Sequence, residues 1–220
     1  MRRGVFKWSV TGSGERKGRP VERWPALELA STIRHDGDGG VADDLATVRG
    51  TTRWIQEHGE SSAGELVADE PFRLDLIELR QAVRSLFARA VGPAPPSPAD
   101  AHRLMAADQA LVHVNTVAAR VPVTPQIDWP ADGTPSARLL SAESDPYVRL
   151  LAALARAAID FLTGPHRTQL RSCTAPRCVR YFVKSHGRQE WCKPSCGNRA
   201  RAARHYRRQR AAGGDEGAQA

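Results

Sequence analysis

The 220-residue sequence has no long apolar run and none of the common catalytic motifs. Cations at Arg16, Lys17, Arg19 and Arg23 interrupt residues 1–30, so this stretch contains no signal-peptide core. No later stretch approaches the roughly 18 apolar residues of a membrane span. The H-E-x-x-H, P-loop and Gly-x-Ser-x-Gly patterns are also absent. We therefore expect a cytoplasmic protein that is neither a membrane protein nor an enzyme.

Cysteine is scarce, and all four cysteines lie in one short stretch. Cys173 and Cys178 form one close pair, Cys192 and Cys196 form a second, and 13 residues separate the pairs. This arrangement predicts one zinc ion held by four thiolates, which leave no open coordination position, so the zinc is structural. Two disulfides are the alternative, but they require an oxidising compartment that we do not expect for this chain.

The residues between the two pairs predict a hairpin. Val179–Val183 is rich in β-branched and aromatic residues, and Gln189–Trp191 is the expected return strand. Phe182 and Trp191 would supply most of a core that is too small to fold without the metal. The predicted order of knuckle, hairpin, knuckle and helix indicates a treble-clef-like zinc finger.

A helix is predicted from Arg199 to Arg210, with Asn198 as its N-cap. A contact with a nucleic-acid base is the alternative role for Asn198. At about 100° per residue, one face of this helix is basic and the opposite side is small and apolar. The basic face comprises Arg201, Arg204, His205 and Arg208. The opposite side comprises Ala202, Ala203 and Tyr206, which we expect to pack against the zinc module.

Positive charge is concentrated near the C-terminus. Residues 171–210 carry 12 Arg or Lys residues against the single Glu190, a net charge of +11, whereas residues 25–170 carry a net charge of −6. Such a density of like charge is costly without a polyanion, so we expect a nucleic-acid partner. Arginine suits both phosphates and guanine edges. The predicted nucleic-acid contacts are Asn198, Arg199, Arg201, Arg204, His205, Arg207, Arg208 and Arg210.

The segment WCKPSCGNRARAARHYRR resembles the CGNR-type zinc finger of bacterial proteins. Leu27–Thr32, Asp44–Leu45 and Thr52–Ile55 resemble the ABATE domain that usually precedes that finger. The resemblance implies a stress-induced transcription regulator whose finger binds DNA.

The residues between the two basic ends predict a mainly helical α+β domain with a small antiparallel hairpin. In its longest predicted helix, from Pro71 to Ala90, the apolar residues recur at four-three spacing, and Arg80 and Arg84 lie off that stripe. The other predicted helices cover Thr47–His58, Ser62–Ala68, the stretch from Ser97 as N-cap to Ala119, and the stretch from Pro146 to Phe161. The hairpin strands are Val121–Trp129 and Ala137–Leu140. Leu27–Ile33 is a short apolar element that could be either a helix or a strand.

These patterns divide the chain into four parts. We expect a disordered basic arm over 1–20, the ABATE-like domain over 21–168, the zinc finger over 169–210 and a disordered tail over 211–220.

Other partners stay open from the sequence alone. RNA or the ribosome could replace DNA, or an acidic protein could meet the basic face. The N-terminal domain would sense an effector, form a homodimer, or do both. A small-molecule sensor or enzyme would require a pocket that gathers His113, Trp54 and Trp129.

Overall fold

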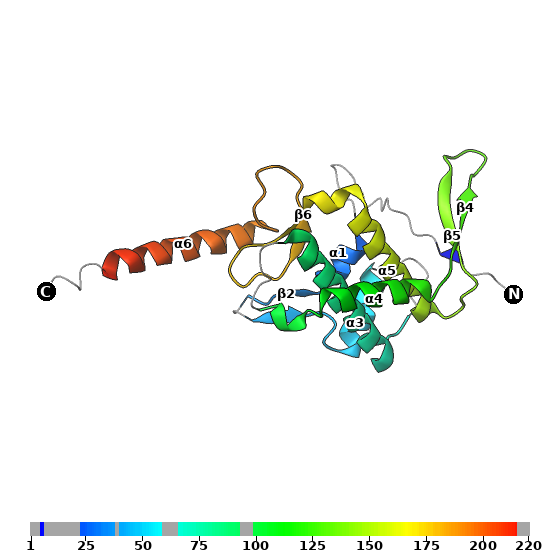
Figure 1. Cartoon of the computed structure of the whole chain (residues 1–220), viewed down its shortest axis with the longest axis horizontal. Coiled ribbons are helices and arrows are strands. Elements are labelled where there is room, and N and C mark those ends of the chain that lie inside the picture. The colour runs from blue at the N-terminus through cyan, green and yellow to red at the C-terminus, as the bar shows by residue number, and fades with distance from the viewer. Residues whose placement is uncertain (1–4, 7–22, 38–39, 59–65, 93–98, 215–220) are drawn as a thin grey trace.

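A computed structural model of the chain describes residues 5–6, 23–37, 40–58, 66–92 and 99–214. A helical body forms its centre, with a β-hairpin at one end and a long C-terminal helix leaving the other (Figure 1). The predicted fold class is confirmed, because the chain is mostly helical with small antiparallel hairpins and a four-cysteine cluster near its C-terminus. Among the described residues, none of the helices is both long and apolar enough to span a bilayer.

The body is built from four helices that pack on one another. They are α1 (Pro25–Ala30), α3 (Glu70–Val91), α4 (Ala107–Ala119) and α5 (Pro146–Thr163). The two longest of these helices, α3 and α5, begin at aspartate N-caps. Asp69 accepts a hydrogen bond from the Phe72 amide, and Asp145 accepts one from the Tyr147 amide. A proline occupies the first turn of each, where its missing N–H costs nothing. A further helix, α2 (Val48–His58), confirms the prediction for 47–58.

The core of this body continues into the zinc finger. Phe87 of α3 packs against Phe161 of α5 and, from another side, against Tyr181, with ring centroids 5.4 and 5.7 Å apart. Leu170 and Tyr181 belong to the same buried cluster as the α3 and α5 side chains. The finger is therefore packed into the body rather than joined by a free linker.

Short antiparallel strands complete the fold. β4 (Thr124–Asp128) pairs with β5 (Ser136–Leu140), which confirms the predicted hairpin, and the other edge of β5 pairs with β1 (Val5–Phe6). The remaining pairs are β2 (Ile33–His35) with β3 (Val41–Asp43), and β6 (Leu170–Ser172) with β7 (Tyr181–Val183). The prediction of a disordered arm is thus wrong at Val5–Phe6; the rest of residues 1–20 lies outside the described residues.

The predicted helix from Ser97 to Ala119 is wrong in its first half. Ser97 lies outside the described residues, a short 3-10 helix covers Ala101–Arg103, and the α-helix starts only at Ala107. Tertiary contacts decide this break, because the Met105 amide donates to Ser85 Oγ at 3.0 Å instead of to a helical carbonyl.

Two further predictions differ from the structure. Part of the predicted helix over 62–68 lies outside the described residues, and 66–68 have no helical structure. The last helix, α6 (Pro194–Gly214), runs past Arg210, so the prediction of a disordered tail from 211 is wrong for 211–214.

Candidate zinc centre and basic helix

The first cysteine pair lies in the turn between β6 and β7. The Cys173 amide donates to the Arg180 carbonyl at 2.9 Å and the Cys178 amide donates to the Ala175 carbonyl at 3.0 Å, which closes a tight knuckle. Arg177 has a positive φ of 59° within this turn. Both thiols of the pair are therefore presented by hydrogen-bonded backbone.

The predicted partner of the strand at 181–183 is wrong. β7 pairs with β6, and Gln189–Trp191 forms no strand. The Gln189 side chain instead accepts hydrogen bonds from the Ser185 amide and hydroxyl at 2.8 and 2.9 Å, which holds 185–189 as a loop. The resulting order, a knuckle within a hairpin followed by a helix that carries the second knuckle, is a treble-clef arrangement.

The second cysteine pair lies at the start of α6. Cys192 lies two residues before the helix and Cys196 lies in its first turn, where the Cys196 amide donates to the Lys193 carbonyl at 3.1 Å. Pro194 opens the helix, so the predicted N-cap role of Asn198 is wrong. Asn198 is exposed one turn further on, and its Oδ1 accepts a hydrogen bond from Arg201 Nη2 at 2.5 Å.

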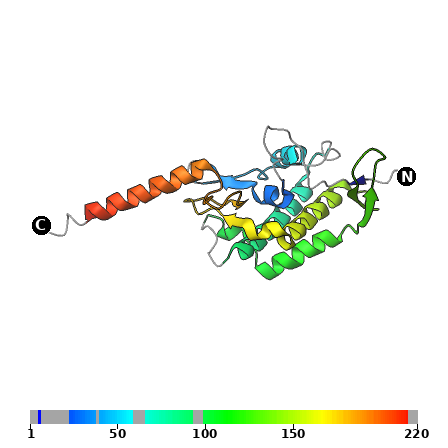
Figure 2. The ribbon, with the colours of Figure 1, turned by 90° about the horizontal axis from the view of Figure 1, so that it is seen from above.

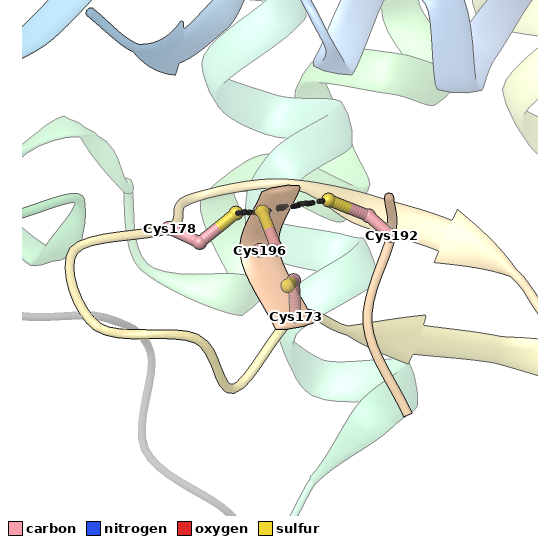
Figure 3. A group of neighbouring side chains, drawn as sticks. All are labelled: Cys173, Cys178, Cys192 and Cys196. Carbon is pink, nitrogen blue, oxygen red and sulfur yellow. Dashed lines mark hydrogen bonds between the residues drawn. The ribbon is translucent and has the colours of Figure 1, made fainter. Parts of the chain in front are cut away.

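The four sulfur atoms converge on one point (Figure 3). All lie within 4.8 Å of one another, and the sulfurs of Cys178, Cys192 and Cys196 are 3.5, 3.8 and 3.9 Å apart. Tetrahedral Zn–S bonds of about 2.3 Å place sulfurs about 3.8 Å apart, whereas a disulfide requires about 2.05 Å. The four thiols are free and together form a site for one zinc ion that leaves no open coordination position. The zinc prediction is confirmed, with Cys173, Cys178, Cys192 and Cys196 as the ligand set.

The acid–base behaviour of the cluster also calls for a cation. The thiols of Cys178 and Cys192 donate to Cys173, and these hydrogen bonds lower the pKa of Cys173 to about 2. Donation to Cys173 raises the pKa of Cys178 to about 11 and raises the pKa of Cys192 further. Four crowded sulfurs cannot all ionise alone, and a divalent cation is what allows four thiolates to coexist.

Arg199 links the second knuckle to the first. Its Nε donates to the Pro176 carbonyl at 2.9 Å and its Nη2 lies 3.5 Å from Cys196 Sγ. A guanidinium in this position offsets the negative charge of the thiolates and ties α6 to the β6–β7 turn. The side chain is half-buried, and we therefore assign Arg199 to the zinc centre rather than to an exposed binding face.

Trp191 packs against the base of α6 at Gly197. A Cβ atom added to Gly197 would lie 2.9 Å from Trp191 Cε3, closer than real side chains approach. The guanidinium groups of Arg201 and Arg204 also lie near the indole, 5.9 and 5.7 Å from the ring centroid. A glycine is therefore required for the tryptophan to seat on the helix.

Replacing Gly197 with alanine is expected to destabilise the finger by about 1–3 kcal/mol, because the indole must move to admit the methyl group. The finger's unfolding, followed by tryptophan fluorescence in urea, measures the effect. Gly187→Ala is the matched control, since an added Cβ there meets nothing within 4 Å. Equal midpoints for the two variants would contradict this role for Gly197.

Beyond its first two turns α6 leaves the body and projects into solvent (Figure 2). Within residues 194–210 Ala200 is the last buried residue, and 201–210 are exposed except for half-buried Ala203. The prediction that Ala202, Ala203 and Tyr206 pack on the zinc module is wrong, because Tyr206 is 67 % exposed and Ala202 is also exposed. The helix carries six arginines and no acidic residue. Within the described part of the chain, no carboxylate pairs with any of these arginines.

A buried arginine joins the body to the finger, and the sequence analysis did not identify it. Arg84 lies beside the apolar stripe of α3 as expected, but it is 0 % exposed. Its Nη2 donates to Asp100 Oδ2 at 2.5 Å and to the Val179 carbonyl at 2.7 Å, and its Nη1 donates to the Ala30 carbonyl. The guanidinium also lies 5.2 Å from the Tyr181 ring centroid. One side chain therefore connects α1, α3, the segment before α4 and the finger.

A second buried arginine lies one turn earlier on the same helix. Arg80 is 3 % exposed and pairs with Asp43 of β3 at 2.5 Å. Burial opposes ionisation of Asp43, but the hydrogen bond and charge of Arg80 outweigh it, so the pKa of Asp43 is lowered. The acid pair Asp43–Asp44 is thus a structural element, since Asp44 pairs with Arg34 at 2.9 Å.

The three residues named for a sensor pocket do not come together. Trp54 is buried and stacks on His58, His113 lies on α4 with Nδ1 3.5 Å from Glu78, and Trp129 is 68 % exposed beyond the end of β4.

Comparison with known families agrees with this architecture. The ABATE family model, described as "Putative stress-induced transcription regulator", matches residues 24–165. The chain belongs to the ABATE family. The CGNR zinc finger model matches residues 169–209 and covers all four cysteines, so both resemblances are confirmed. No curated protein matches the chain. Hereafter the body is called the ABATE domain and residues 169–209 the CGNR finger.

Proposed function

We propose that this protein is a zinc-dependent, DNA-binding transcription regulator that grips DNA through the exposed part of α6. The observation that carries the proposal is the exposed part of the helix: residues 201–210 carry five arginines and no acidic residue, and this part projects from the body. A cluster of arginines without neighbouring carboxylates on an exposed helix is typical of a surface that binds a polyanion. In this proposal the protein regulates without catalysing a reaction.

The shape of α6 supports duplex DNA as the polyanion. An α-helix with its side chains is about 10–12 Å across and the major groove of B-DNA is about 12 Å wide. Arg201, Arg204 and Arg208 share one face, Arg210 lies on the opposite side, and Arg207 lies between them. A helix seated in the groove would therefore direct arginines toward the phosphates of both strands and toward guanine edges between them.

The ABATE domain would supply sensing, homodimerisation or both. A sensing role is supported by the contacts between this domain and the finger. Leu170 and Tyr181 of the finger are part of the core of the domain, and Arg84 of the domain donates to the Val179 carbonyl of the finger. A change in the packing of the domain would therefore act on the base of α6.

The Arg204→Glu, Arg208→Glu double variant tests the docking face. Loss and reversal of two charges one turn apart is expected to weaken duplex DNA binding about 100-fold or more and to reduce the log–log salt slope by about 2. Fluorescence anisotropy with a labelled duplex, titrated at several salt concentrations, measures both quantities. The helical far-UV signal is expected to stay unchanged.

Arg49→Glu, Arg53→Glu is the matched control, because these two exposed arginines also lie one turn apart on a helix, α2 of the ABATE domain. It makes the same change in net charge away from α6. Equal weakening by both double variants would reduce the effect to overall charge and contradict the docking face. Tighter binding of an RNA hairpin than of the duplex would identify RNA as the partner instead.

A further inference from the structure

A cavity of about 390 Å³ lies where the ABATE domain meets the CGNR finger. This junction cavity is lined by α1, α2 and the finger, including Trp24, Leu27, Ser31, Trp54, His58 and Arg180. Its volume falls in the range of about 300–1,000 Å³ that is typical of small-molecule sites, and such sites are common at domain interfaces. None of the functions proposed above uses it.

Ring side chains that are already fixed form the apolar wall of the junction cavity. Trp24 packs against Phe161 and His166, with ring centroids 6.1 and 5.3 Å away. Trp54 stacks on His58 at 5.3 Å with an interplanar angle of 14°. His58 Nδ1 lies 3.0 Å from the Trp54 carbonyl, which can only accept, so Nδ1 carries the proton and holds the ring in place. A flat apolar ligand would meet a preformed surface.

Of the charged side chains that line the junction cavity, Arg180 is the one without an ion pair among the described residues. Arg23 pairs with Glu28 at 2.8 Å, and Asp44 pairs with Arg34 at 2.9 Å. Arg180 has no ion pair among the described residues, and its Nε is buried without a hydrogen-bond partner there. The Arg180 guanidinium is therefore the cation lining the cavity that has no carboxylate beside it in the described part of the chain, and it favours a ligand that carries negative charge. A monoanion satisfies this need, whereas a dianion would be repelled by the two carboxylates.

From these features we infer that the junction cavity binds a small aromatic carboxylate, with its carboxylate on the Arg180 guanidinium and its ring against Trp24 and Leu27. The inference goes beyond the proposed function, because it assigns a ligand class and a site for it. Arg180 lies two residues after the zinc ligand Cys178, and its carbonyl accepts the Cys173 amide at 2.9 Å. A ligand held by Arg180 would therefore be coupled directly to the first zinc knuckle.

Calorimetric titration of the full-length, zinc-loaded protein with benzoate tests the site. Saturable binding at one ligand per chain is expected, and benzamide, which has the same ring without the charge, should bind at least about tenfold more weakly. Arg180→Gln should weaken benzoate binding by about tenfold or more and leave benzamide binding within about twofold. Arg188→Gln, at an exposed arginine of the same finger, is the matched control and should bind benzoate like the original chain.

Ser31→Phe provides a second test that leaves Arg180 in place. Ser31 lines the junction cavity and its side chain makes no hydrogen bond among the described residues, so a phenyl ring there should fill the space and abolish binding of both probes. Zinc content is measured for every variant, so that damage to the finger is separated from loss of the site. Absence of saturable benzoate binding, or equal benzoate affinity in Arg180→Gln and the original chain, would overturn the inference. No nucleic acid is present, so either result leaves the DNA proposal to its own test.

Discussion

Cys196→Ser is expected to lose its zinc ion and, with it, the folded CGNR finger. The buried cluster around the site contains only six residues, three of which are cysteines, so the metal rather than this small core holds the two knuckles together. A structural zinc site contributes on the order of 10–16 kcal/mol of folding free energy, far more than such a core can replace. Metal analysis should fall from one zinc per chain to none, and the affinity for duplex DNA should fall about 100-fold or more.

The same substitution should also lower the thermal midpoint of the ABATE domain, because Leu170 and Tyr181 of the finger are part of its core. Thermal unfolding of the ABATE domain and the CGNR finger is followed by circular dichroism in the far and near ultraviolet. Ser195→Ala, an exposed neighbour in the same turn, should behave like the original chain. A Cys196→Ser protein that keeps one zinc and an unchanged midpoint would refute the four-cysteine site.

Arg84→Met is expected to destabilise the protein by about 3–5 kcal/mol. The substitution leaves the Asp100 carboxylate buried without its cation, which costs more than the ion pair contributes. It also removes the donor to the Ala30 and Val179 carbonyls. The urea midpoint measures the loss, and faster zinc release to a chelator should accompany it because Val179 adjoins Cys178.

Two further variants separate burial from charge. Arg89→Met removes an arginine from the same helix whose ion pair with Asp108 is exposed and 3.7 Å long, so its effect should stay below about 0.5 kcal/mol. Adding Asp100→Leu to Arg84→Met removes the orphaned charge, and we expect it to recover at least about half of the lost stability. No recovery in this double variant would show that the carboxylate is not the source of the cost.

The features that the sequence predicted depend on local signals. Proline and aspartate at 69–71 and 145–146 start α3 and α5, and the spacing of four cysteines is sufficient to define a zinc site. Each of these signals lies within the element that it specifies. The same holds for the β4–β5 hairpin, whose strands are joined by a single loop over 129–135.

The features that the sequence did not predict depend on contacts across long stretches of chain. β7 pairs with β6 and not with Gln189–Trp191, because Leu170 of β6 and Tyr181 of β7 are both buried in the main core. The burial of Arg84 could not be predicted from its place off the apolar stripe, because its partners lie far away in the sequence, at 30, 100 and 179. The start of α6 could have been found, since Pro194 is as good a first-turn signal as Asn198 is an N-cap.

The long helix α6 is held by contacts at its N-terminal end. Its 21 residues span about 30 Å, and these contacts, made by Cys196, Arg199, Ala200 and the indole of Trp191, form a clamp. A tilt of about 10° at that clamp would sweep the tip at Gly214 through about 5 Å, roughly the rise of one helical turn. Movements too small to disturb the zinc ligands are thereby magnified at the far arginines.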